Sequence, residues 1–451
     1  MTARADTASK HVTFTLDGES VTALPGETIL QAARRHGREI PHLCYKDAMR
    51  ADGNCRACMV EIQGERVLAP SCCRTPSEGM VVDSAGERPR KAQRMVLELL
   101  QSDMAETAYT HSSELDHWSV KLGLDKPRFP PREQPATDIT HPAIAVNLDA
   151  CIQCTRCVRA CREVQVNNVI GFARRGAEAE IVFDQGDPLG ESTCVACGEC
   201  VQACPTGALM PAGGVGLEVA ERAVDSVCPY CGVGCQLTYQ VSDNRILFVT
   251  GRDGPANSER LCVKGRYGFD YVHHPQRLSV PLIRRADAPK RAALELDPEE
   301  RLRAFREATW EEALDFAATG LRRIRDAHGP SALAGFGSAK GSNEEAYLFQ
   351  KLVRTGFGTN NVDHCTRLCH ASSVAALLEM IGSGAVSNPV RDAAYAQVIV
   401  VIGSHTTANH PVAATFLKNE AAAGKTLIVM DPRRNPIAEH ATHFLQFKPD
   451  T

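Results

Sequence analysis

Apolar and polar residues alternate over residues 11–24, as they do in strands that bury one face. The apolar positions are Val12, Phe14, Leu16, Val21 and Ala23. Asp17-Gly18 separates the two runs, and an Asp-Gly pair in that place predicts a β-hairpin. Pro25-Gly26-Glu27-Thr28 then predicts the start of a helix that runs to about Arg35, with Thr28 as its N-cap.

The spacing of apolar residues changes to that of a helix over residues 88–122, where Met95, Val96, Leu99 and Leu100 recur. A cluster of prolines follows and predicts a stiff linker. The prolines of this linker are Pro127, Pro130, Pro131, Pro135 and Pro142.

Beyond Trp310, helical spacing alternates with short apolar runs. Helices are expected at 310–327, 343–354, 371–381 and 412–423, and strands at 333–336, 398–402 and 427–430. This alternation predicts a parallel sheet flanked by helices. The sequence ends at Thr451 without a terminating element, so we expect a fragment that stops inside an open α/β domain.

Composition narrows the class of protein. A chain of 451 residues is expected to form several domains, and 43% hydrophobic with 23% charged residues is ordinary for a globular protein. A net charge of −4 gives no reason to expect nucleic acid as a partner, and no apolar run is long enough to span a membrane. The first ten residues carry neither an apolar signal core nor a twin-arginine pair, which favours a cytoplasmic protein. In that compartment the 19 cysteines are expected to bind metal rather than form disulfides.

Sixteen of the cysteines form four ligand sets that all precede Val263. The first set has a wide first gap inside a hairpin–helix frame, and this spacing favours a [2Fe–2S] cluster over structural zinc, the alternative. Its members are Cys44, Cys55, Cys58 and Cys72. Gly53 and Gly64 suit a loop that passes close to sulfur, and the spare Cys73 is expected to be a buried thiol.

A Cys-x2-Cys-x2-Cys-x3-Cys motif occurs twice between residues 147 and 210, as in ferredoxins with two clusters. In that arrangement the fourth cysteine of each motif binds the other cluster. One [4Fe–4S] cluster is therefore expected on Cys151, Cys154, Cys157 and Cys204, and another on Cys194, Cys197, Cys200 and Cys161. The first motif departs from the pattern in having Arg162 where a proline is usual, and zinc is a poor alternative for this spacing.

The fourth set is followed by Val263-Lys264-Gly265 and comprises Cys228, Cys231, Cys235 and Cys262. Cys-x2-Cys-x3-Cys with a distant Cys-x-Lys-Gly resembles the N-terminal [4Fe–4S] domain of molybdenum or tungsten bis-pterin oxidoreductases. The resemblance implies that Lys264 lies between this cluster and the pterin cofactor. The alternative for Lys264 is a solvated surface lysine.

The segment 366–374, TRLCHASSV, resembles the active-site segment of formate dehydrogenases. The resemblance implies that Cys369 ligates the metal and that His370 positions substrate or relays a proton. Taken alone, a Cys-His pair indicates only a packed helix start. Three further segments resemble the family's pterin–nucleotide contacts and follow expected strands, where open α/β sheets bind ligands. Their candidate residues are Gly337, Lys340, Gly403, Ser404, His410, Asp431 and Arg433.

Residues 1–282 also resemble the large iron–sulfur subunit of respiratory NADH dehydrogenase. Together the segments are similar to the catalytic alpha subunit of cytosolic NAD-dependent molybdenum formate dehydrogenase. The fold expected is multidomain α+β and α/β. Its parts are a [2Fe–2S] ferredoxin-like domain (1–85), a helical segment with a Pro-rich linker (86–143), a two-[4Fe–4S] ferredoxin-type domain (144–220), a [4Fe–4S] bis-pterin domain (221–282) and an incomplete α/β molybdopterin domain (283–451).

The resemblance implies oxidation of formate to CO2 at a Mo or W bis-molybdopterin guanine dinucleotide centre. Electrons are expected to pass Lys264 and the [4Fe–4S] clusters to the [2Fe–2S] cluster. Gly335-x-Gly337 lacks a full dinucleotide fingerprint, so NAD and flavin are expected on diaphorase-type partner subunits. Two rivals remain: an assimilatory nitrate reductase, which Arg367-x-Cys369-His370 disfavours, and a non-catalytic electron-transfer subunit.

Two departures from the family qualify this hypothesis. Relatives often carry a further [4Fe–4S] site on one histidine and three cysteines, but no cysteine lies between Cys73 and Cys151 to join His111 or His117. Four clusters are therefore expected, three [4Fe–4S] and one [2Fe–2S]. Family chains are also longer, so the substrate arginine and the rest of both pterin sites are expected beyond Thr451. The sequence assigns no role to Cys73 or Cys365 and does not choose between Mo and W.

Overall fold

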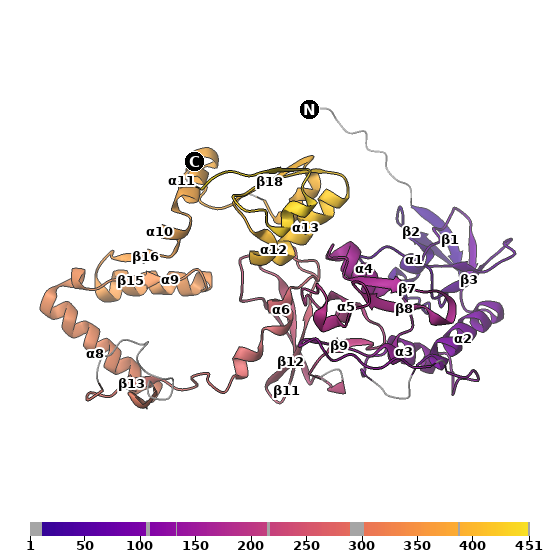
Figure 1. Cartoon of the computed structure of the whole chain (residues 1–451), viewed down its shortest axis with the longest axis horizontal. Helices are drawn as coiled ribbons and strands as arrows, with labels where there is room; N and C mark the ends of the chain where they lie inside the picture. Colours follow the sequence, from indigo (N-terminus) through magenta and orange to yellow (C-terminus); the bar gives the residue numbers. More distant parts are fainter. Residues whose placement is uncertain are drawn as a thin grey trace. The chain divides into compact units, whose positions relative to one another are not determined.

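The structure is a computed structural model that describes residues 11–104, 109–131, 133–213, 217–288, 302–386 and 388–449 (Figure 1). The chain divides into two compact units. The first comprises Met1–Phe269 and Val390–Thr451, and the second comprises Asp270–Pro389. Among the described helices, none has the length and apolar composition that crossing a bilayer requires.

The first unit begins with the expected hairpin, β1 (Val12–Leu16) and β2 (Glu19–Ala23). Helix α1 (Ile29–Arg35) starts at Thr28, whose side chain accepts from the Gln31 N–H in a capping box. Three more strands complete a five-stranded sheet in the order β2-β1-β5-β3-β4. They are β3 (Met59–Ile62), β4 (Ala69–Pro70) and β5 (Val81–Asp83). Phe14 and Leu16 share the core of this sheet with Cys58 and Cys72, so the core itself positions two predicted ligands.

The expected helical segment consists of two helices, α2 (Glu87–Ser102) and α3 (Glu114–Lys121). Ser113 caps α3 by accepting the Asp116 N–H. Thr110, Ser112 and Ser113 favour turns and caps over a helix interior, which explains why a new helix begins here.

The duplicated cysteine motif forms a small domain of short elements. Strand β6 (Ile144–Val146) pairs with β9 (Leu209–Pro211), and β7 (Ile170–Ala173) pairs with β8 (Glu180–Phe183). Helices α4 (Arg156–Arg159) and α5 (Glu199–Ala203) lie within the two motifs, and α4 continues into a π-helical turn at Ala160–Val164.

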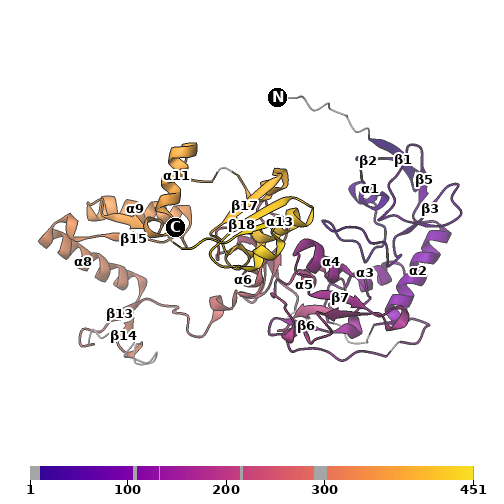
Figure 2. The ribbon, with the colours of Figure 1, turned by 45° about the horizontal axis from the view of Figure 1, so that its top comes forward.

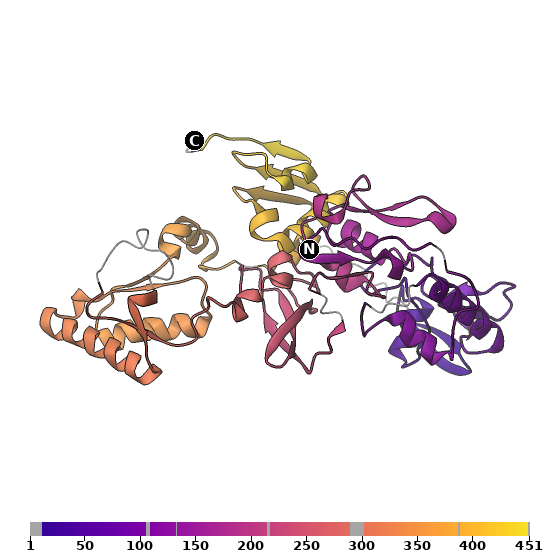
Figure 3. The same ribbon diagram turned by 60° about the horizontal axis from the view of Figure 1, so that its bottom comes forward.

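The next domain is an antiparallel sheet of β10 (Arg222–Val227), β11 (Gln236–Ser242) and β12 (Arg245–Gly251), followed by α6 (Val263–Tyr267). The C-terminal part of the first unit is a parallel sheet of β17 (Val398–Ile402), β18 (Thr426–Met430) and β19 (His443–Leu445). Its helices are α12 (Thr406–Asn409) and α13 (Pro411–Ala422), and α13 lies against the sheet (Figure 2). The strands run side by side in Figure 3.

The second unit contains the antiparallel pair β13 (Leu282–Arg284) and β14 (Phe305–Glu307) and the parallel pair β15 (Gly335–Gly337) and β16 (Val362–His364). Its helices are α8 (Trp310–His328), α9 (Asn343–Lys351), α10 (Thr366–Cys369) and α11 (Ala371–Ile381). As expected, the described strands beyond Trp310 pair in parallel, β15 with β16 in the second unit and β17 with β18 and β19 in the first. Alternating patterns indicate parallel strands, but they do not determine which strands become neighbours.

Candidate functional site

The first cysteine set comes together beside the core of the N-terminal sheet. Cys44, Cys58 and Cys72 are buried, and the Cys44 N–H donates to the Cys55 sulfur at 3.4 Å. Hydrogen bonds with the thiols of Cys55 and Cys72 lower the pKa of Cys44, which places these thiols in direct contact. Cys58 in turn interacts with Cys72, so neighbouring thiols link the four members of the set and supply the soft ligands that an iron–sulfur cluster needs.

Cys73 is exposed, so the expectation of a buried thiol was wrong. Its sulfur lies 3.6 Å from that of Cys72, at the surface of the cysteine loop. Gly53 has a φ of +63°, and a Cβ there would lie 2.8 Å from the Cys73 sulfur, so this glycine does pass close to sulfur. Gly64 serves a turn instead, because a Cβ there would meet nothing within 4 Å.

The duplicated motif places the fourth cysteine of the second run with the first three of the first run. A small cavity is lined by Cys151, Cys154, Cys157 and Cys204. On the other side, burial raises the pKa of Cys200, and the charges of Cys197, Cys194 and Cys161 raise it further. The structure thus brings together the two sets that the crossed arrangement requires.

Both motifs have left-handed backbone at matching positions. Gln153 and Thr155 have φ values of 55° and 60°, and Ala196 and Gly198 have values of 52° and 71°. The N–H groups of Gln153 and Ala196 donate to the sulfurs of their preceding cysteines, at 3.4 Å and 3.3 Å. Left-handed non-glycine residues are costly and concentrate at functional sites, and such turns aim backbone N–H groups at anions.

These features test whether the residues fit iron–sulfur clusters. Buried and half-buried cysteines line a shared cavity, and the half-buried Cys151 accepts a backbone N–H bond, as anionic cluster ligands do. In the described ranges, no group of three or more His, Cys, Asp or Glu side chains is gathered as a single ion would require.

The fourth set lies between β10 and α6. The Cys228 N–H donates to the Cys235 carbonyl at 2.9 Å. Burial raises the pKa of Cys235 to about 12, with further contributions from the charges of Cys228, Cys231 and Cys262. Lys264 is exposed, and its Nζ lies 5.8 Å from the centroid of the Tyr230 ring, within the Cys228–Cys231 loop. Lys264 therefore lies at the edge of this cysteine set.

Arg266 joins this domain to the second ferredoxin motif. Only 3% exposed, it donates to the Cys197 carbonyl at 2.7 Å and to Glu199 Oε1 at 2.6 Å. Glu199 Oε1 also accepts the Leu261 N–H at 2.9 Å. A cavity of about 720 Å³ has both Cys197 and Cys262 in its lining, so two successive cysteine sets share one boundary.

Replacement of Glu199 by glutamine is expected to destabilise this junction by about 3–5 kcal/mol, because it leaves the buried Arg266 without its carboxylate. Denaturant unfolding of the cluster-loaded protein, followed by cluster absorbance, measures the change. Asp225→Asn is the matched control, since it removes an exposed ion pair with Arg252 and is expected to cost about 0–1 kcal/mol. Equal losses of unfolding free energy in the two variants would show that the Glu199–Arg266 pair does not stabilise this junction.

Cys369 and His370 lie in the second unit, where α10 ends and α11 begins. Both are exposed, and His370 breaks the helix with φ −151° and ψ 33°. The pair therefore marks the start of a helix, as its local pattern indicates, but its side chains are exposed rather than packed. Cys365, at the N-cap of α10, is also exposed, with its sulfur 3.9 Å from Nδ1 of His364.

Candidate cofactor residues follow strand ends in both units. In the second unit, Gly337 ends β15 opposite His364, the last residue of β16, so Lys340 and Cys369 follow the same edge of one parallel pair. In the first unit, Gly403 and Ser404 follow β17, and Asp431 follows β18.

Asp431 bonds directly to one other first-unit candidate, Arg433. Its carboxylate is buried and accepts the Arg433 N–H at 2.8 Å and the Asn435 side chain at 3.2 Å. These bonds use only part of the acceptor capacity of the carboxylate. Arg433 is exposed, and His410 lies at the N-cap of α13.

Sequence reasoning missed several buried cations. Arg156, Arg159, Arg266 and Lys418 are each no more than 6% exposed and bond to carbonyl or side-chain oxygens near the cysteine motifs. The position of Arg156 and Arg159 inside the first cysteine motif was the only hint in the sequence that they could lie near a cluster. The sequence does not distinguish a buried arginine from an exposed one.

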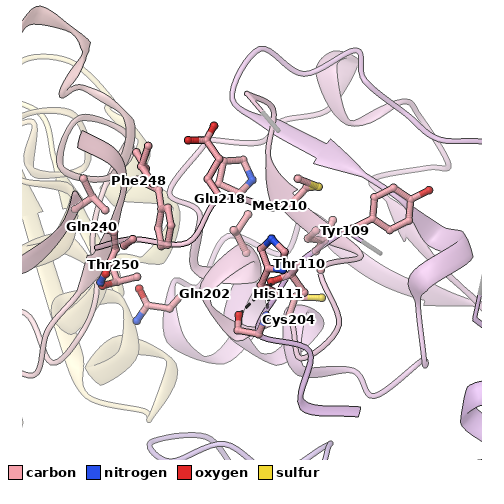
Figure 4. Close-up of a pocket in the computed structure, with 18 of the residues that line it drawn as sticks. Tyr109, Thr110, His111, Gln202, Cys204, Met210, Glu218, Gln240, Phe248 and Thr250 are labelled. Atoms are coloured by element: carbon pink, nitrogen blue, oxygen red, sulfur yellow. Dashed lines mark hydrogen bonds between the residues drawn. The ribbon is translucent and has the colours of Figure 1, made fainter. Parts of the chain in front are cut away.

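A cavity of about 770 Å³ lies beside Cys204 in the first unit (Figure 4). Its lining includes His111 from the segment before α3, Gln202 from α5 and Phe248 from β12. Tyr109 and Glu218 in its wall adjoin segments outside the described residues, so we assign it no ligand.

Four family models match successive parts of the chain. They are "2Fe-2S iron-sulfur cluster binding domain" over residues 9–87, "NADH-quinone oxidoreductase subunit 3, ferredoxin-like domain" over 141–210, "Molybdopterin oxidoreductase Fe4S4 domain" over 221–274 and "Molybdopterin oxidoreductase" over 277–451. The matched domains indicate a [2Fe–2S] cluster, [4Fe–4S] clusters and molybdopterin.

Curated relatives match along nearly the whole chain. "Probable oxidoreductase YjgC" of Bacillus subtilis is 31% identical over 96% of this chain and 47% of its own length. A Staphylococcus haemolyticus protein named "Putative formate dehydrogenase" is 30% identical over 98% of this chain and 48% of its own length. The chain thus spans about half the length of these relatives. A structure titled "Crystal structure of NAD+-reducing [NiFe]-hydrogenase in the H2-reduced state" is 31% identical over 44% of this chain and 87% of that chain, with a TM-score of 0.41, too low to support an argument. The set and order of these matched domains identify the protein as a molybdopterin oxidoreductase with [2Fe–2S], Nqo3-like ferredoxin and Fe4S4 domains.

Proposed function

We propose that the protein oxidises formate to CO2 and delivers the electrons to NAD+ on partner subunits. The observation that carries the proposal is the exposed Cys369-His370 pair at the strand-end edge of a molybdopterin oxidoreductase domain. Relatives named as formate dehydrogenases match along 98% of the chain and support formate as the substrate.

Cys369 is proposed to ligate Mo or W, with the bis-molybdopterin guanine dinucleotide held in part by the strand-end residues Gly337, Lys340, Gly403, Ser404, His410, Asp431 and Arg433. When bound, this centre supplies a two-electron acceptor for formate. The 11-residue helix α11 begins directly after Cys369-His370. His370 is proposed to take the proton that formate oxidation releases, since an imidazole can act as a general base.

The four cysteine sets are proposed to hold three [4Fe–4S] clusters and one [2Fe–2S] cluster, with Lys264 at the edge of the set nearest the pterin domain in sequence. Successive sets adjoin one another in the first unit. Cys44 and Cys154 share one buried cluster of side chains, and Cys197 and Cys262 line one cavity. This continuity supports electron transfer through the whole series, with flavin and NAD bound to diaphorase-type partners beside the [2Fe–2S] domain. A cytoplasmic location is proposed as well, because that compartment keeps this many cysteines reduced and able to bind iron.

Formate-dependent bleaching of cluster absorbance tests the proposal in the anaerobically purified full-length protein. We expect metal analysis to find Mo or W, formate to reduce the clusters, and nitrate to leave the reduced clusters unchanged. Reoxidation by nitrate would favour a nitrate reductase. Absence of both metals, with clusters intact, would favour a non-catalytic electron-transfer subunit.

A further inference from the structure

The loops that carry Cys44 and Cys154 meet directly inside the first unit. Cys44 and Cys154 belong to one buried apolar cluster, together with Trp118 of α3. The Thr155 hydroxyl also donates to Asp52 at 2.9 Å, so polar contacts join the same two loops. No other cysteine set lies between these two in the described sequence.

Arg159 lies at this junction, inside the first ferredoxin motif. It is 3% exposed, and its guanidinium donates to the carbonyls of Cys44, of Arg50 and, at 3.4 Å, of Cys154. The Arg159 side chain thus bonds to the backbone carbonyls of two cysteines that belong to different cysteine sets.

The charge of Arg159 has no carboxylate partner among the described residues. The neighbouring Arg156 differs, because its guanidinium bonds both carboxylate oxygens of Glu114, at 2.9 Å and 2.7 Å. Nε of Arg159 is also buried without a hydrogen-bond partner in the described part of the chain. A buried cation that hydrogen-bonds only to carbonyl oxygens destabilises the fold unless an anionic group lies nearby.

We infer that Arg159 balances the negative charge of the iron–sulfur clusters at Cys44 and Cys154 and positions the two cluster loops for direct electron transfer between them. The inference rests on the cluster assignments of the proposed function, but not on formate as substrate. Each one-electron reduction adds negative charge to a cluster, and a nearby buried cation stabilises that reduced form. Arg159 therefore raises the reduction potentials of both clusters.

An EPR-monitored redox titration of the cluster-loaded protein with dithionite tests this role without substrate or partner subunits. Arg159→Gln keeps a hydrogen-bond donor and removes the charge. A unit charge about 10 Å away, at an effective dielectric constant of about 20, changes the reduced-to-oxidised ratio roughly tenfold. We expect both midpoint potentials to fall by about 59 mV, the value of a tenfold change for one electron. The other two [4Fe–4S] clusters are expected to keep their potentials.

Two variants complete the test. Arg159→Lys keeps the charge and is expected to restore most of the shift. Arg50→Gln removes an exposed cation, with 65% of its side chain accessible, from the same junction and is expected to change neither potential. Unchanged potentials in Arg159→Gln, or equal shifts of all four clusters, would overturn the inference. If Arg159→Gln loses a cluster, Arg159→Lys decides: retention of both clusters supports a role for the charge, and loss of the same cluster refutes it. A wild-type protein without a [2Fe–2S] signal would refute the cluster assignment instead.

Discussion

Replacement of Cys369 by alanine is expected to lower kcat/KM for formate by more than about 100-fold. Residues that only support a metal ligand already contribute 10–100-fold, and Cys369 is proposed as the ligand itself. The side chain is exposed, and no described hydrogen bond ends on its sulfur, so its removal is expected to leave the fold intact. Formate-dependent cluster reduction and metal content, measured on the full-length protein, report the two effects separately.

Cys365→Ala is the matched control for this variant. Cys365 is exposed in the same segment, four residues earlier, and the account gives it no role in metal binding. It is expected to retain activity within about twofold, the range of a neutral surface change. Activity of Cys369→Ala close to that of Cys365→Ala would show that the active-site assignment is wrong.

Replacement of Cys204 by serine is expected to remove the cluster of the first motif, although Cys204 belongs to the second motif in sequence. The reason is the shared cavity, which Cys204 lines together with Cys151, Cys154 and Cys157. Iron content is expected to fall from about 14 to about 10 per chain, as the loss of one [4Fe–4S] cluster requires. EPR and iron analysis after anaerobic purification make the measurement.

Cys161→Ser provides the reciprocal variant. Its expected effect is loss of the cluster at Cys194, Cys197 and Cys200, because the charge of Cys161 acts on the buried Cys200 thiol. If Cys204→Ser instead removed the second-motif cluster, the ligands would not be crossed between motifs.

Much of the local structure was predictable because it depends on neighbouring residues. The hairpin at Asp17-Gly18 and the N-cap at Thr28 follow from turn and cap chemistry, and the structure has both. The strand ends at Gly337 and Ile402 follow from short apolar runs before glycine. Cysteine spacing likewise predicted that Cys204 would lie near Cys151, Cys154 and Cys157, with which it lines one cavity.

Other features depend on contacts between distant segments and were not predictable. Apolar runs do not specify which strands become neighbours, so the pairing of β15 with β16 and of β17 with β18 was not predictable. The exposure of Cys73 depends on how its loop folds over the sheet. The burial of Arg159 depends on a loop more than a hundred residues earlier, whose Cys44 carbonyl accepts its hydrogen bond. The association of Cys369 with the strand-end residues of the first unit stays a prediction.

Anomalous X-ray scattering at the iron and molybdenum or tungsten edges tests the central claim most directly in crystals of the full-length protein. We expect four iron sites in this chain, at the four cysteine sets, and one Mo or W peak at the Cys369 sulfur. A heavy-metal peak bound elsewhere, or iron sites without any Mo or W, would contradict it.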